Sequence, residues 1–159
     1  MKNIRLVLLG ELILFVAIFG VNLFSWAVGG LSNIAWFLDL PSIILIVAVL
    51  IPGLLIMGEW KDFIKSFSVG IKPYTLLELK NIIGAVSAAQ KLTVFGALFA
   101  IITSGILIIG RLDNPEKLGP NLAVCFLAGF YAVIIEFFLL PLRLNAERKM
   151  NEEMDLGDE

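Results

Sequence analysis

The sequence predicts an all-α, polytopic membrane protein with four transmembrane helices and both termini on the cytoplasmic side. Of its 159 residues, 59% are hydrophobic and the mean hydropathy is +0.95, whereas soluble domains are about half apolar. Four apolar stretches have roughly the length of the ~20-residue helix that crosses a bilayer. They lie at residues 6–28, 40–57, 92–110 and 121–142. We expect one membrane domain over residues 1–159.

The first two stretches are bounded by residues typical of membrane interfaces and helix starts. Trp26 and Trp36 bracket the turn after the first stretch, as interfacial anchors do. Pro41 stands at the start of the second stretch, where a proline is tolerated. Pro52 lies inside the second stretch and predicts a kink or a local defect there.

The cytoplasmic amphipathic segment, residues 58–91, predicts two helices. The first is short, lies in the membrane interface and is broken by Gly70 and Pro73. Its apolar residues, at helical spacing, are Trp60, Phe63, Ile64 and Phe67. Thr75 and Glu78 then form a capping box that starts a second helix. Because no breaker follows, we expect this helix to continue through the third stretch.

The amphipathic start of this long helix predicts which side chains face the protein interior. The expected apolar stripe is Leu76, Leu79, Ile83 and Val86. The opposite side is expected to carry Glu78, Asn81, Ala85 and Ala88.

The last stretch predicts a loop followed by a membrane helix. Asn114-Pro115 favours a turn, and Gly119-Pro120 is suited to begin a helix because proline is favoured at the first helical position. Pro141 and Arg143 are expected to close the span. Residues 143–159 form a charged tail, and the part from Glu147 to Glu159 is expected to be frayed.

Charge placement predicts the orientation. All but two of the 12 Lys and Arg side chains lie at the chain start, in the segment 58–91 or after residue 142. The two exceptions are Arg111 and Lys117, which lie between the third and fourth stretches. Because cytoplasmic loops carry an excess of cations, both termini and the central segment are expected in the cytoplasm.

Composition also argues against several functions. The net charge of −2 favours no nucleic-acid partner. The chain has no histidine and one cysteine, Cys125, inside a predicted span. No nucleophile–base pair, metal cluster or phosphate-binding loop is recognisable. We therefore expect neither an enzyme, a metal site nor a cofactor.

Several short motifs resemble the MotA/TolQ/ExbB family, and its MotA branch in particular. The final hairpin carries Leu112-Asp113-Asn114-Pro115, then Leu118-Gly119-Pro120, Ala123-Val124, Tyr131 in mid-helix and Leu140-Pro141 at the exit. Residues 37–42, which include Asp39 and Pro41, resemble the start of the family's second span. The resemblance covers about half of the chain and implies structural roles for these motif residues.

The resemblance implies a multi-span subunit of an ion-driven complex in the bacterial inner membrane. Such subunits form pentamers around single-span partners resembling MotB, ExbD or TolR, and the partner carries the ion-binding acid. The family's large cytoplasmic domain, which acts on the flagellar rotor, has no counterpart between the second and third spans. We therefore expect a shortened, non-flagellar homologue of the stator subunit.

Three residues are candidates for the ion pathway. Glu136 is an ionisable group within a span, which is a functional hypothesis by default. It could also reach the interface or pair with Arg143. Thr103 and Ser104 place hydroxyls at mid-depth, where they could contact an ion or bond to the backbone one turn earlier.

Small residues predict where helices pack closely, either within the chain or between subunits. Gly96, Ala100 and Ser104 form a row with a spacing of four residues on the third span. On the fourth span, small residues share one face at spacings of four and three residues, namely Cys125, Gly129 and Ala132.

Two alternatives stay open. Aligned on the hairpin motif, the family's hydroxyl pair of the fourth span falls on Ala128-Gly129, and its third-span threonine falls near Ile101. This departure fits a non-conducting scaffold of the same fold. A remoter alternative is a small proton-coupled multidrug transporter, because such four-span proteins carry a glutamate in the first span, as Glu11 does here.

Overall fold

The structure is a computed structural model that describes residues 39–110 and 115–157, together with residues 9, 10, 12, 13, 16, 17 and 20. Glu11, Asp113 and most of the predicted first span lie outside the described residues. The described chain is all-helical and contains α2 (Leu40–Ile56), α3 (Trp60–Ser66), α4 (Leu76–Ile109) and α5 (Pro115–Gly157).

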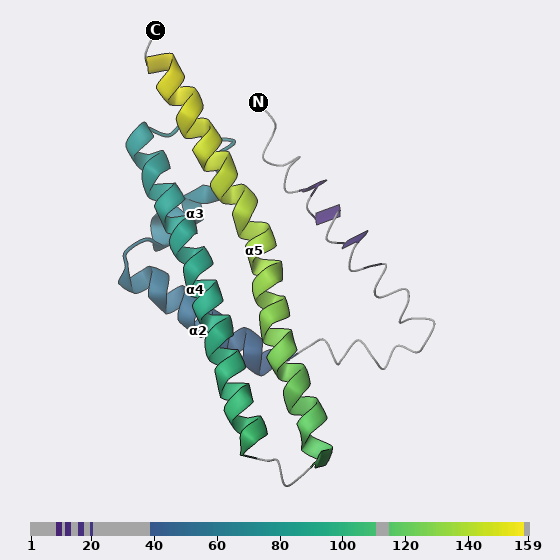
Figure 1. The fold of residues 1–159 in the computed structure, drawn as a ribbon. Helices are drawn as coiled ribbons and strands as arrows, with labels where there is room; N and C mark the ends of the chain where they lie inside the picture. The colour runs from purple at the N-terminus through teal and green to yellow at the C-terminus, as the bar shows by residue number, and fades with distance from the viewer. Residues whose placement is uncertain are drawn as a thin grey trace.

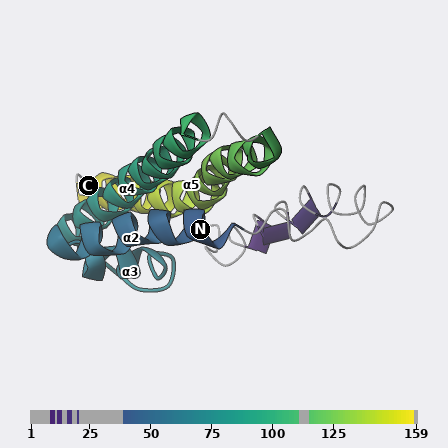
Figure 2. The same ribbon diagram turned by 90° about the horizontal axis from the view of Figure 1, so that it is seen from below.

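The longest helices, α4 and α5, run antiparallel and side by side as a hairpin (Figure 1). Seen along the hairpin, α2 and α3 both lie on one of its faces (Figure 2). By length and composition, α4 and the Leu118–Asp155 part of α5 can each cross a membrane. In the part of the chain that is described, α2 and α3 make a third span only if they are counted together, across a bend of 111°.

Helix α2 begins and ends through local backbone chemistry. The Asp39 side chain accepts a hydrogen bond from the Ser42 N–H at 3.1 Å, and Pro41 occupies the first turn. The helix continues through Pro52 to Ile56. Gly58 then has φ +73°, and the N–H groups of Gly58 and Glu59 bond back to the carbonyls of Leu55 and Leu54. This is a Schellman motif, for which glycine is favoured because it has no Cβ.

The short helix α3 is amphipathic, as the spacing of its apolar residues indicates. Phe63 is buried, whereas Ile64 and Phe67 are about half exposed. Phe63 packs in the core cluster with Leu54 and Val86, so it joins α3 to both α2 and α4.

Helix α4 starts at the predicted capping box and continues for 34 residues without a break. The prediction of its buried face was partly wrong. Ala85 is fully buried and Ala88 is 8% exposed, while Leu76 is 44% exposed. The alanines are buried because α4 packs against α5 and α2 on two sides, and small side chains allow this close approach.

Helix α5 is longer at both ends than the sequence predicts. It begins at Pro115, five residues before Pro120, and it continues through Pro141 to Gly157. The prediction that Gly119-Pro120 starts the helix was therefore wrong, and the helix itself does not end at Pro141 and Arg143, which were expected to close the span. Pro115 is tolerated as the first helical residue because the first N–H groups of a helix have no intrahelical partner.

The last part of α5 is helical to Gly157 and is docked up to Met150, which corrects the prediction that the tail from Glu147 is frayed. Ala146 is fully buried and packs in a cluster with Val69, Leu79 and Ile82, to which Met150 adds contact. The Lys149 ammonium donates to the carbonyls of Val69 and Lys72, at 3.1 Å and 2.7 Å. These contacts hold the helix beyond Pro141 against the loop between α3 and α4.

Candidate functional site

Two motif segments that are 92 residues apart meet at the start of α2. The backbone N–H of Asp39 donates to the Tyr131 hydroxyl at 2.8 Å. Tyr131 also packs against the small cluster of Ile46, Ala97 and Ala132, which joins α2, α4 and α5. The first turn of α2 has free N–H groups, and Tyr131 satisfies the N–H of the cap residue itself. This contact fixes the start of α2 against the middle of α5.

A polar pair bridges the hairpin where the sequence places Glu136. The Gln90 amide of α4 donates to Oε2 of Glu136 at 2.9 Å. Oε1 of Glu136 is buried and has no hydrogen-bond partner among the described residues. The alternative pairing with Arg143 does not form; the Nε of Arg143 donates instead to Glu147 at 2.8 Å.

An open groove of about 370 Å³ lies beside this pair. It is lined by Ser87, Gln90, Lys91, Val94 and Phe95 of α4 and by Glu136 and Arg143 of α5. Lys91 is the last charged residue of α4 before its apolar part, so the groove lies at the boundary between the polar and apolar parts of the hairpin.

The hydroxyls of Thr103 and Ser104, the other two ion-pathway candidates, lie near the C-terminal end of α4, away from this groove. The Thr103 hydroxyl donates to the Phe99 carbonyl one turn earlier, at 2.8 Å. Ser104 is 7% exposed. Neither residue lines the groove that contains Glu136. The structure therefore does not bring the three ion-pathway candidates into one site.

The small residues lie in contacts within the chain. A Cβ built on Gly96 would lie 2.9 Å from Ile46 Cα, so the backbones of α4 and α2 approach closely here. Ala100 and Ala132 are buried. The Cys125 thiol lies 3.7 Å from the Ile101 carbonyl, and a Cβ on Gly129 would lie 3.9 Å from the same residue's side chain.

The remaining motif residues take structural positions on α5. Pro115 is its first residue, and Gly119 and Pro120 are exposed in its second turn. Pro141 lies between Leu139 and Leu142, both of which are buried and pack in the cluster with Leu54 and Val86.

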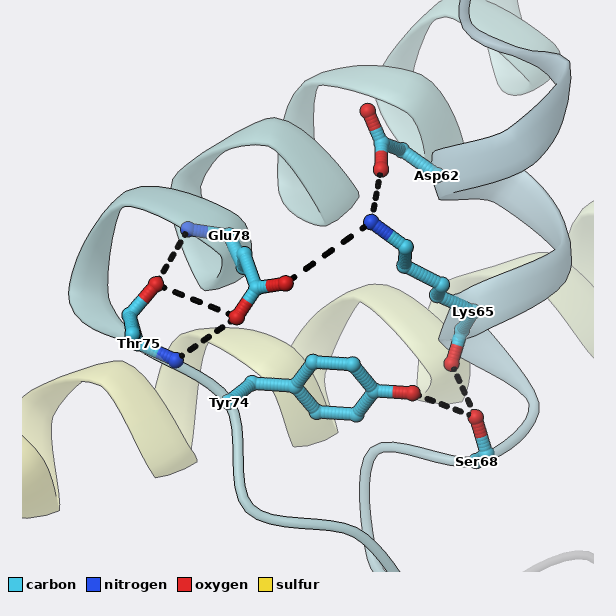
Figure 3. Close-up of polar contacts among 6 residues, drawn as sticks. All are labelled: Asp62, Lys65, Ser68, Tyr74, Thr75 and Glu78. Atoms are coloured by element: carbon cyan, nitrogen blue, oxygen red, sulfur yellow. Dashed lines mark hydrogen bonds and ion pairs between the residues drawn. The ribbon is translucent and has the colours of Figure 1, made fainter.

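The polar ends of α3 and α4 are tied together by a surface cluster (Figure 3). The Glu78 carboxylate accepts from the Thr75 N–H at 3.1 Å, and Lys65 lies 2.8 Å from Asp62 and 3.9 Å from Glu78. The hydrogen bonds from Thr75 hold the pKa of Glu78 below its ordinary value. The hydrogen bond to Asp62 raises the pKa of Lys65.

Sequence reasoning missed two polar residues of α4. Gln90 is the partner of Glu136, and its only signal is its place one residue before Lys91, at the edge of the apolar stretch. Thr93 is fully buried, and its hydroxyl has no partner among the described residues. Within the same ranges, no three Cys, Asp or Glu side chains are grouped closely enough to hold a metal ion.

Fold and site together define a helical protein with a hairpin whose helices are long and apolar enough to cross a membrane. No protein-family model, curated protein or solved structure matches the chain. The resemblance to the MotA/TolQ/ExbB family therefore stays a prediction from the motifs.

Proposed function

We propose that the chain is the multi-span subunit of a homo-oligomeric, ion-driven complex of the MotA/TolQ/ExbB kind in the bacterial inner membrane. The observation that supports this most is the hydrogen bond between Asp39 and Tyr131. Both residues were singled out by the resemblance, in separate motifs, and their contact gives those motifs a shared structural purpose. We propose a pentamer around a single-span, acid-bearing partner.

In this proposal Glu136 handles a proton. Its Oε1 is buried and has no hydrogen-bond partner among the described residues. This oxygen can therefore accept a proton without breaking a hydrogen bond. Gln90 positions the carboxyl group through Oε2. The pair also lies between two helices of the hairpin, where a change in its protonation acts on their packing.

The test begins with the complex as it exists in its native membrane. The tagged chain is extracted in mild detergent, and its companions are identified by mass spectrometry. We expect a second protein with one membrane span and an acidic residue within that span. Recovery of the multi-span chain alone, with no proton flux after reconstitution, would contradict the proposal.

Proton flux into liposomes that hold the purified complex then tests Glu136. Glu136→Gln should lower the flux at least tenfold, because an amide cannot take up and release the proton. Glu147→Gln is the matched control, since Glu147 is on the same helix and pairs with Arg143 outside the apolar stretch. Equal flux in both variants would remove Glu136 from the pathway.

A non-conducting scaffold with the same fold is the second candidate, and a specific observation favours it. The Thr103 hydroxyl is engaged with the Phe99 carbonyl. The positions expected to carry the family's hydroxyl pair on the fourth span hold Ala128, which is fully buried, and Gly129. A complex that assembles with its partner and carries no proton current would support this candidate.

A further inference from the structure

The groove beside Glu136 has a chemical character that proton handling does not explain. Its lining includes two cationic side chains, Lys91 and Arg143, and two exposed apolar side chains, Val94 and Phe95. Val94 is 44% and Phe95 is 64% exposed. From Leu92 to Gly110 the chain has no charged residue, so Val94 and Phe95 extend from the groove toward the apolar part of α4.

The polar groups that the groove offers are mainly hydrogen-bond donors. Lys91 forms no salt bridge with any described residue. Arg143 uses Nε toward Glu147, which leaves its two terminal nitrogens, and its side chain is 40% exposed. Glu136 is the one acid among the lining residues; its Oε2 accepts from Gln90 and its Oε1 is buried.

We propose that this groove binds an anionic phospholipid, with the phosphate between Lys91 and Arg143 and an acyl chain along Val94 and Phe95. A phosphodiester suits paired Lys and Arg donors. Basic side chains where membrane helices leave the hydrocarbon attract anionic headgroups. The two cations come from different helices, so the bound lipid fastens α4 to α5 at their polar boundary.

The inference rests on the membrane location within the proposed function, and it is independent of proton handling and of the number of subunits. A chain that assembles and conducts but binds no lipid selectively would overturn the lipid site alone. A chain that binds the lipid but carries no current would leave the lipid site standing.

Native mass spectrometry of the full chain in mild detergent tests the proposal. Phosphatidylglycerol, phosphatidylcholine and soluble glycerophosphate are titrated separately. We expect phosphatidylglycerol to be retained most strongly and glycerophosphate not to be retained. Lys91→Gln combined with Arg143→Gln should weaken phosphatidylglycerol retention about 30-fold, from about 1 kcal/mol for each cation near a membrane surface.

The matched control combines Lys80→Gln with Arg148→Gln, which removes the same charge from α4 and α5 at exposed positions outside the groove. It should retain phosphatidylglycerol like the unsubstituted chain. Equal loss in both double variants would overturn the proposal. Equal binding of phosphatidylcholine, or tight binding of glycerophosphate, would also overturn it, because the site would then select acyl chains alone or a soluble phosphate.

Photo-cross-linking gives a second measurement that needs no substitution. Phosphatidylglycerol with a photoactivatable acyl chain should label the peptide that contains Val94 and Phe95 in preference to other apolar parts of α4 and α5. Labelling spread evenly along the exposed apolar side chains of both helices would contradict a defined site.

Discussion

The approach of α4 to α2 depends on Gly96 having no side chain. A Cβ at this position would lie 2.9 Å from Ile46 Cα and 3.2 Å from the Ile46 carbonyl oxygen. Both atoms belong to the backbone of α2, so the added methyl group cannot be accommodated by a rotamer change. Gly96→Ala must therefore shift α2 away from α4, together with the contacts of Ile46 and Tyr131.

The magnitude follows from two opposing effects. Extra atoms in a packed interior typically cost about 1–3 kcal/mol, while replacing glycine by alanine inside a helix gains about 1 kcal/mol. Gly105→Ala, on the same helix, gives the second effect alone, because a Cβ there has nothing within 4 Å. We expect Gly96→Ala to be less stable than Gly105→Ala by about 1–3 kcal/mol.

The assay is unfolding of the detergent-solubilised chain by SDS titration, followed by far-UV circular dichroism. Both variants add one methyl group to one helix, so their difference reports the packing of α4 on α2. If Gly96→Ala proves as stable as Gly105→Ala or more stable, the close approach at Ile46 is wrong.

Three further predictions use the same unfolding assay or hydrogen exchange. Gly58→Ala should destabilise by about 1–2 kcal/mol because Gly58 has φ +73°, whereas Gly84→Ala, with open space around its Cβ, should stabilise by about 0.5–1 kcal/mol; equal shifts would refute the Schellman turn. Gln90→Leu should lower the free energy of unfolding by about 1–3 kcal/mol, because it leaves the Glu136 carboxyl unpaired. Adding Glu136→Leu should recover most of this loss. If the losses of the two substitutions simply add, the two side chains are not paired. Amides of residues 144–155 should exchange slowly and should lose protection in Lys149→Met, because the Lys149 ammonium holds α5 to two loop carbonyls; rapid exchange in the unsubstituted chain would mean a frayed tail.

The pH dependence of stability has a definite sign at the start of α4. The pKa of Glu78 is lowered in the folded chain, so its ionised form stabilises the fold above the ordinary glutamate pKa of about 4.3. That contribution is lost as the pH falls through the lowered pKa. Glu78→Gln should make the free energy of unfolding depend less on pH in the acidic range, from about pH 5 to about pH 2. The same pH dependence in the variant and in the unsubstituted chain would contradict the capping role.

Local signals were read correctly where one turn of chain contains all the chemistry. The Thr75 and Glu78 capping box and the unbroken course of α4 follow from residues that are close in sequence. The short helix α3 was also predicted from spacing, although Ile64, which was placed on the same apolar stripe as the buried Phe63, is half exposed. Such features need no knowledge of the rest of the fold.

Features that depend on partners distant in sequence could not be predicted. Pro141 disfavours a helix locally, but burial of Leu139, Leu142 and Ala146 keeps α5 continuous past it. Ala85 has no strong preference for either face until other helices pack around it. Tyr131 was singled out as a motif residue, but nothing in a single sequence pairs it with Asp39.

The subunit stoichiometry tests the central proposal most directly. The chain, extracted from its native membrane in mild detergent, is weighed as an intact assembly by native mass spectrometry. We predict an assembly of five copies, with density for a partner on the shared axis when the same sample is imaged by electron cryo-microscopy. A monomer, or a dimer with no central axis, would contradict the proposal that this chain is the multi-span subunit of such a complex.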